Sequence, residues 1–157
     1  MESGGQHDAT NHHALIGSWA LLSWENLGAD GQVSHPMGVD AVGYLIYSFD
    51  GRFSVTISRA DRTRSAGDDL LGGTLEEKAR AAEGFVAYAG RYTFHGDHVV
   101  HHVELSLFPN WVGTDQRRSV ELSAQVLILS AGPILMAGRQ QVPRLTWRRV
   151  YLPLEAD

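Results

Sequence analysis

The sequence of 157 residues contains no cysteine. Disulfide bonds, thiolate nucleophiles and cysteine-ligated zinc or iron–sulfur centres are therefore excluded. Because a chain without cysteine suits a reducing or an oxidising compartment, this absence leaves the compartment open, and we expect the cytoplasm by default.

Positive charge is also scarce. The 13 lysine and arginine residues are outnumbered by 18 acidic residues, which gives a formal net charge of −5. Basic residues form no cluster beyond isolated pairs such as Arg117-Arg118, so the sequence offers no surface that matches a phosphate backbone. We expect no nucleic acid partner.

Long hydrophobic runs are missing as well. No apolar run approaches membrane-spanning length, and residues 1–13, "MESGGQHDATNHH", lack the apolar core of a secretory signal. We expect no membrane partner and a disordered lead-in over residues 1–13. The hydrophobic content of 43% suffices for one substantial core, which predicts a single domain over residues 14–157.

The sequence does contain a series of short apolar stretches separated by turn residues. Many are rich in valine, isoleucine, tyrosine and phenylalanine, which favour strands. Residues 40–59 predict two strands joined at Asp50-Gly51, a dipeptide suited to a tight hairpin. About eight strands joined mostly by short turns predict an all-β protein, an antiparallel up-and-down barrel with room for one small ligand.

One segment, residues 74–89, has helical periodicity. Thr74 and Glu77 predict a capping box, and Gly90 supplies a stop signal. The predicted apolar stripe consists of Leu75, Ala79, Ala82, Phe85, Val86 and Ala89. We therefore expect one mid-chain amphipathic helix that packs on the sheet.

Two motifs at opposite ends of the chain carry a family resemblance. Gly17-Ser18-Trp19 resembles the glycine-x-tryptophan signature of lipocalins, and Arg149 stands where lipocalins place an arginine across that tryptophan. Three longer stretches strengthen the match: "SHPMGVDAVGYLIYSFDGRFSV", "LEEKARAAEGFVAYAGRY" and "HHVELSLFPNWVGTDQRR". Over roughly residues 15–151 the chain resembles the small bacterial and fungal lipocalin-like domain family.

The resemblance implies a calycin-like barrel in which Trp19 and Arg149 have structural roles. It also implies a setting in secondary-metabolite pathways, where related barrels cyclise, isomerise or dehydrate reactive intermediates, although many have no assigned activity. The sequence departs from secreted lipocalins because it has no cysteine or signal and because its predicted helix lies mid-chain. These differences argue against extracellular transport.

The stretch 98–107 carries the candidate chemistry. Alternation along a strand puts His98, Val100, His102, Glu104 and Ser106 on one face, and Val99, His101, Val103, Leu105 and Leu107 on the other. If the apolar face lines the interior, His102 and Glu104 are surface residues. If the helix covers the apolar face, both point into the cavity, where a carboxylate can orient a histidine for acid–base catalysis. The second arrangement makes His102 and Glu104 the candidate catalytic pair.

Six residues are candidates for ligand binding: Tyr44, Arg59, Ser106, Asn110, Trp111 and Arg118. Either arginine could bind a carboxylate or enolate oxygen. Trp111 offers an aromatic surface that stacks on a ligand or seals the barrel end. Tyr44 is preferred to Tyr47, which lies on the opposite face of the same predicted strand.

No specific metal or cofactor site is expected, although His102 and Glu104 offer two metal ligands on one strand face and His98 could add a third without a recognisable spacing. His101 and His102 point to opposite strand faces, so they do not ligate one ion together without a bulge. None of the 17 glycines lies in the strand–loop–helix context of a nucleotide-binding fingerprint.

These features support two main functions. The leading hypothesis is a cofactor-independent lyase, isomerase or cyclase that acts on a hydrophobic oxygenated metabolite, polyketide-like or aromatic. The alternative is a non-catalytic carrier or sequestering protein for such a compound, because the same pocket serves both. A packed barrel that acts through its surface is a third interpretation. Under any of the three, the protein could assemble as a homodimer.

Overall fold

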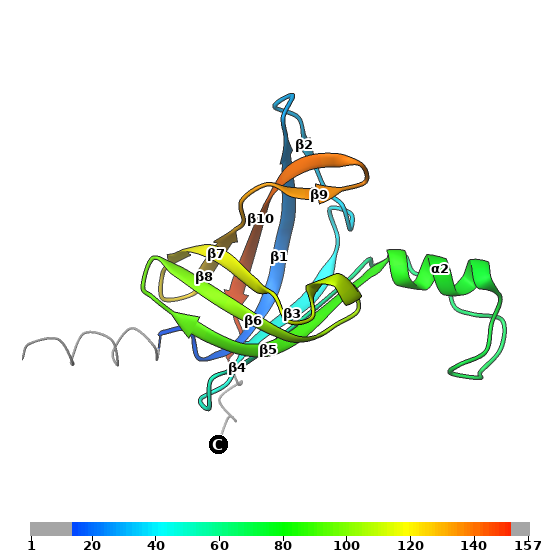
Figure 1. Cartoon of the computed structure of the whole chain (residues 1–157), viewed down its shortest axis with the longest axis horizontal. Helices are drawn as coiled ribbons and strands as arrows, with labels where there is room; N and C mark the ends of the chain where they lie inside the picture. Colours follow the sequence, from blue (N-terminus) through cyan, green and yellow to red (C-terminus); the bar gives the residue numbers. More distant parts are fainter. Residues whose placement is uncertain (1–13, 152–157) are drawn as a thin grey trace, which may run out of the picture.

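The computed structural model describes residues 14–151. Eight antiparallel strands close into a barrel in the order β1, β3, β4, β5, β6, β7, β8, β10, and β10 pairs back to β1 (Figure 1). Their bounds are β1 Gly17–Gly28, β3 Val42–Tyr47, β4 Arg52–Ser58, β5 Phe85–Phe94, β6 His98–Ser106, β7 Asp115–Leu122, β8 Val126–Ser130 and β10 Arg139–Arg149. The predicted barrel is confirmed, whereas the lead-in predicted for residues 1–13 lies outside the described residues.

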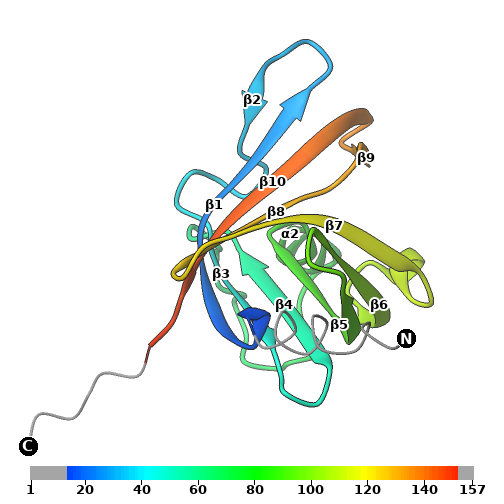
Figure 2. The same ribbon diagram turned by 90° about the vertical axis from the view of Figure 1, so that its left-hand side faces the viewer.

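Two short strands lengthen one side of the barrel. β2 (Val33–Ser34) pairs with the end of β1, and β9 (Ile134–Met136) pairs with the start of β10. Figure 2 shows both as part of a flap that extends past the other strands. The opposite end carries tight hairpins, including the predicted turn at Asp50-Gly51, where Gly51 has a φ of 84°.

The core fills the opposite end from this flap. Trp19 is fully buried, and its indole N–H donates to the carbonyl of Leu15 at 2.9 Å. The Arg149 guanidinium lies 4.1 Å from the centre of the Trp19 ring and donates to the carbonyls of Ala14 and Ile16. The cation–π contact and these hydrogen bonds tie the first and last strands together and plug this end.

The mid-chain helix is shorter than predicted. α2 spans Leu75–Glu83, with the predicted capping box between Thr74 and Glu77 present, and ends at Gly84. Residues 85–89 were predicted to be helical, but they pair with β4 as the start of β5. These positions alternate aromatic or branched side chains with alanine, a composition that sheet pairing favours over continuing the helix.

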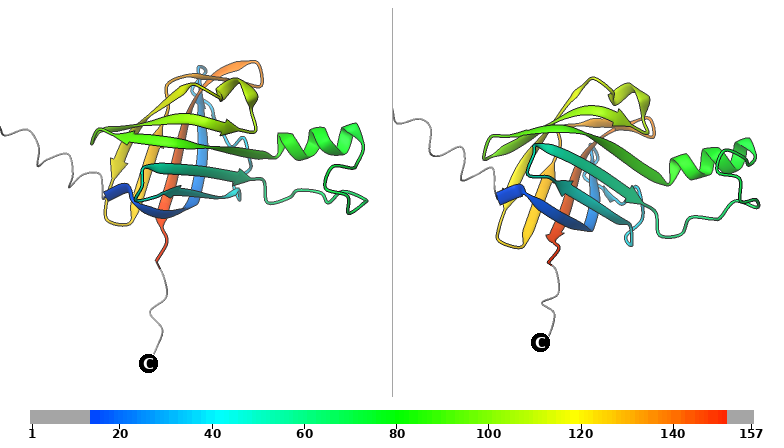
Figure 3. Two further views of the ribbon diagram at one scale, coloured as in Figure 1. Left: turned by 60° about the horizontal axis from the view of Figure 1, so that its bottom comes forward. Right: turned by 90° about the horizontal axis from the view of Figure 1, so that it is seen from below.

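The prediction that this helix covers the sheet is also wrong. α2 contains no buried residue, and Leu75 is 86% exposed. Both views in Figure 3 show the helix standing away from the barrel at one end. It is too short and too polar to be a membrane span, and no other helix of the described chain is long and apolar enough for one.

A β-bulge interrupts the pairing of β5 with β6. Ala89 pairs with Leu105 and Gly90 pairs with Val103, so Glu104 is an extra residue. A Cβ atom at Gly90 would lie 2.0 Å from the carbonyl oxygen of His102, so only glycine fits there. Without the bulge, Leu105 would be the next inward-facing residue of β6 after Val103. The extra residue moves that position on by one, so Ser106 faces inward instead.

Candidate functional site

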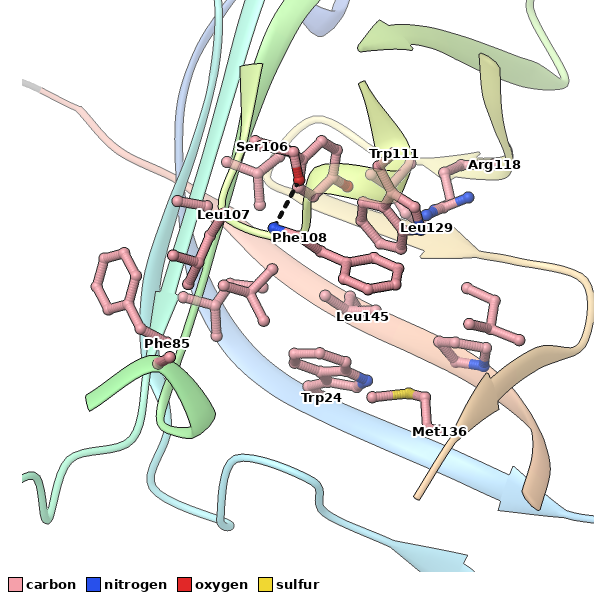
Figure 4. Close-up of a pocket in the computed structure, with 18 of the residues that line it drawn as sticks. Trp24, Phe85, Ser106, Leu107, Phe108, Trp111, Arg118, Leu129, Met136 and Leu145 are labelled. Carbon is pink, nitrogen blue, oxygen red and sulfur yellow. Dashed lines mark hydrogen bonds between the residues drawn. The ribbon is translucent and has the colours of Figure 1, made fainter. Parts of the chain in front are cut away.

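The barrel contains a cavity of about 690 Å³. It lies towards the end where α2 joins β5, where β6 leads into the 3₁₀ helix η1 (Pro109–Trp111), and where β9 and β10 begin. Its walls are mostly apolar or aromatic and include Trp24, Val55, Ile57, Phe85, Tyr88, Leu107, Phe108, Trp111, Leu129, Met136, Leu145 and Trp147. Figure 4 shows Trp111 and Arg118 on one side of this space and Trp24 with Met136 on the other.

An aromatic corner forms one wall of the cavity. The rings of Tyr88 and Trp111 meet edge to face with centroids 5.1 Å apart, and Phe108 lies 6.1 Å from Trp111. Aromatic pairs at these separations hold each other in defined orientations. The corner therefore offers a planar ligand fixed ring surfaces.

Arg118 is the main charged side chain in the cavity wall. It is only 7% exposed and donates to the carbonyl of Arg117 at 2.9 Å and to Gln116 Oε1 at 3.5 Å. Within residues 14–151, no carboxylate lies close enough to form an ion pair with it. A buried guanidinium without a counterion is unfavourable unless another group supplies the negative charge.

Neutral polar rings lie near Arg118. The hydroxyl of Tyr47 and Nε2 of His101 are hydrogen-bonded at 2.7 Å, and the His101 ring stacks on Phe53 at 4.2 Å. The His101 ring centre is 5.9 Å from that of Tyr88, which lines the cavity. Tyr47 and His101 are thus buried beside the cavity without lining it.

Burial sets the protonation of this cluster. It lowers the pKa of His101 well below its usual 6.5, and the charge on Arg118 lowers it further. Burial also raises the pKa of Tyr47 and of Tyr88 above 10, while the nearby Arg118 opposes the rise. All three rings are therefore neutral at physiological pH.

The predicted catalytic pair does not face the cavity. His102 lies on the outer face of β6, between Asp115 Oδ1 at 2.7 Å from its Nδ1 and Thr93 Oγ1 at 2.9 Å from its Nε2. Glu104, in the bulge, pairs at the surface with Arg52 at 2.6 Å and Arg91 at 3.2 Å. Because α2 does not pack on β6, the apolar face of this strand is shielded from water only if it faces the barrel interior. Its polar face, which carries His102, is therefore on the outside.

The predicted ligand-binding residues divide evenly between two locations. Ser106, Trp111 and Arg118 line the cavity. Tyr44 is 57% exposed on the outer face of β3, Asn110 is exposed in η1, and Arg59 pairs with Asp61 outside the barrel interior. The preference for Tyr44 over Tyr47 is corrected, because Tyr47 is the inward residue and is 1% exposed.

Two residues of the polar cluster, His101 and Tyr88, were missed from the sequence, and the third, Tyr47, was considered but not chosen. His101 had a readable signal, because it is the one polar residue on an apolar strand face. Tyr88 could not be found, since its segment was assigned to a helix. Among residues 14–151, no group of three or more histidine or acidic side chains is placed to hold a metal ion.

Residues 16–150 match the sequence model of a lipocalin-like domain. The chain belongs to this lipocalin-like family. A curated relative from Aspergillus oryzae is 36% identical over 106 residues, covering 62% of this chain and 96% of the relative. That relative is named 4'-hydroxy-3'-methoxypropiophenone carrier protein ppsC. The resemblance predicted from the sequence motifs is thereby confirmed.

Proposed function

We propose that this lipocalin-like protein binds a small, apolar, oxygenated aromatic compound in its barrel and carries it without chemical change. The observation that carries the proposal is the cavity of about 690 Å³ with mostly apolar walls. This volume lies in the usual range of small-molecule sites, roughly 300–1,000 Å³. A barrel filled by its own side chains would have no such space.

The name of the A. oryzae relative supports this ligand class. The compound in its name is a propiophenone, an aromatic ring with a ketone, a hydroxyl and a methoxy group. A compound of that kind suits walls of aromatic and aliphatic side chains with few polar groups. The relative is also named as a carrier, which favours the carrier function over the catalytic one for this chain.

Isothermal titration calorimetry with 4'-hydroxy-3'-methoxypropiophenone tests the proposal. We expect saturable binding at one site, abolished by Ser106→Trp, which fills the cavity from β6. Ser119→Trp on β7 is the matched control because Ser119 is exposed and does not line the cavity. Absence of binding by the wild type, or equal loss in both variants, would contradict the carrier function.

Proton-transfer catalysis is a second candidate function, favoured by the buried hydrogen bond between Tyr47 and His101. Because neither residue lines the cavity, a substrate would exchange a proton with this neutral imidazole and phenol only after moving past Tyr88, whose ring centre is 5.9 Å from that of His101. In heavy water, an isomerase would replace the hydrogens next to the ligand's ketone with deuterium, which proton NMR detects as signal loss. A carrier leaves that signal unchanged over many ligand exchanges.

A further inference from the structure

We propose that Arg118 anchors an ionised oxygen of the ligand, so that the cavity selects planar, apolar compounds with one acidic phenol or carboxyl group and binds them as anions. This inference rests on the proposed function of the cavity and specifies its ligand class. It follows from the contacts of Arg118, the charges around it and the unpaired hydrogen-bond donors of the cavity.

The first argument is the unmet charge of Arg118. The guanidinium has five N–H donors in a fixed planar arrangement, and the acceptors described around it, the Arg117 carbonyl, the Gln116 amide oxygen at 3.5 Å and the Tyr88 hydroxyl, are all neutral. Its side chain is held among Trp111 and Leu129 in the cavity wall, away from bulk water. An anionic ligand oxygen would supply both the missing charge and the missing acceptor.

The second argument is that the protein around Arg118 supplies no negative charge. The nearest titratable groups on neighbouring elements are His101 on β6, Tyr88 on β5 and Tyr47 on β3. His101 and Tyr47 are buried, Tyr88 is partly buried, and all three are neutral. Glu83, the acidic residue in the cavity lining, is exposed at the end of α2. The immediate surroundings of Arg118 therefore carry a net positive charge before a ligand enters, because Glu83 lies in the exposed part of the lining.

The third argument is the kind of hydrogen-bonding group that the cavity leaves unused. The indole N–H of Trp147, which lines the cavity, is buried and has no partner among residues 14–151. An indole nitrogen donates and does not accept. This nitrogen is shielded from the open space of the cavity, so the donors that a ligand meets are those of Arg118, and a matching ligand presents oxygen acceptors.

Neighbouring aromatic rings favour a conjugated acid over a flexible one. Tyr88, Trp111 and Phe108 form edge-to-face contacts close to Arg118 and present flat surfaces. A phenolate keeps its oxygen in the plane of its ring, so the oxygen can reach Arg118 while the ring packs on this corner. A benzoate has the same geometry, whereas an alkyl chain leaves part of the aromatic surface unused.

Three probes of similar shape test the inference by calorimetry: 4'-hydroxypropiophenone, 4'-methoxypropiophenone, which has no acidic proton, and 4-propylbenzoate. We expect the hydroxy probe to bind the wild type about tenfold or more tightly than the methoxy probe, as for a hydrogen bond to a charged group. The benzoate tests whether the site prefers a carboxylate or a phenolate. It binds more tightly than the hydroxy probe only if the site prefers a carboxylate.

An absorption titration supplies a readout that needs no variant. The phenolate of a hydroxyaryl ketone absorbs at a longer wavelength than the phenol, so its band reports ionisation of the bound probe. We expect this band for the complex at a pH where the free probe is neutral, since the positive charge of Arg118 lowers the pKa of the bound hydroxyl.

Arg118→Met tests the assignment to this residue, with Arg117→Met on the exposed side of β7 as the matched control. Arg118→Met should remove both the preference for the hydroxy probe and the phenolate band, while methoxy binding changes less than about threefold. If the wild type binds both ketones equally and shows no phenolate band, the anchor role is overturned and the carrier function stands. If no probe binds, the proposed function itself fails.

Discussion

At the scale of single residues, His101 and His102 show how neighbouring side chains of one type take different roles. His101 is fully buried between Tyr47 and Phe53, whereas His102 bonds to Asp115 and Thr93 at the surface. Strand alternation predicts that they face opposite sides, but it does not say which side is interior. The position of α2 settles which side is interior. Because the helix does not cover the outer side of β6, that side meets solvent and carries the polar residues.

Buried neutral His101 predicts a pH dependence of stability. Its pKa is lowered on folding, so the unfolded chain binds a proton near pH 6.5 that the folded chain does not. The free energy of unfolding therefore falls as the pH drops below that value, by up to about 1.4 kcal/mol per pH unit. Urea unfolding at pH 7.5 and 5.5 should show a smaller drop for His101→Gln than for the wild type, because the other histidines contribute equally to both. Equal drops would contradict a neutral buried His101.

The outward position of Glu104 gives a second prediction at this scale. Its partners, Arg52 and Arg91, have side chains that are 53% and 65% exposed, so the pairs are screened by water. Glu104→Gln should lower the free energy of unfolding by less than about 1 kcal/mol. Ligand affinity, measured by calorimetry, should stay within about twofold of the wild type. A large loss of affinity would restore Glu104 to the binding site.

At the scale of secondary-structure elements, the strands and the start of the helix at Thr74 could be predicted from the sequence, whereas the C-terminal end of the helix could not. Asp50-Gly51 marks a hairpin by its own turn preference, and the β3–β4 register follows from it. The helical period of residues 74–89 continues past Gly84, although pairing of Phe85 with Ser58 on β4 ends the helix there. That pairing joins residues distant in sequence, so no local pattern reveals it.

The bulge in β6 is a second feature of this kind, and it depends on Gly90. Strict alternation puts Ser106 on the face of His102, but the extra residue at Glu104 turns Ser106 into the cavity. Gly90→Ala should lower the free energy of unfolding by about 1–3 kcal/mol, because its Cβ would overlap the His102 carbonyl. Gly67→Ala is the matched control, since nothing lies within 4 Å of a Cβ there. Urea unfolding measures both, and similar effects would argue against a steric role for Gly90.

At the scale of the whole molecule, the two ends of the barrel have separate tasks. The end plugged by Trp19 and Arg149 is tightly packed and hydrogen-bonded, whereas the other holds the cavity and the unpaired Arg118. The two shortest family motifs, Gly17-Ser18-Trp19 and Arg149, lie at the plugged end, which explains why they predict the fold well and the ligand poorly. The ligand class had to come from the cavity, whose residues are spread over most of the chain and have no common motif.

This division predicts how a ligand changes stability. A compound that binds only the folded barrel, at 100 times its Kd, adds about 2.7 kcal/mol to the free energy of unfolding. For a domain of this size each kcal/mol raises Tm by about 2–4 °C, so thermal unfolding should shift upward by about 5–10 °C. Arg149→Met should lower Tm without the ligand yet keep the ligand-induced rise, because its contacts lie at the plugged end. Arg118→Met should lose most of the rise for an anionic ligand, and the reverse pattern would show that the ligand binds elsewhere.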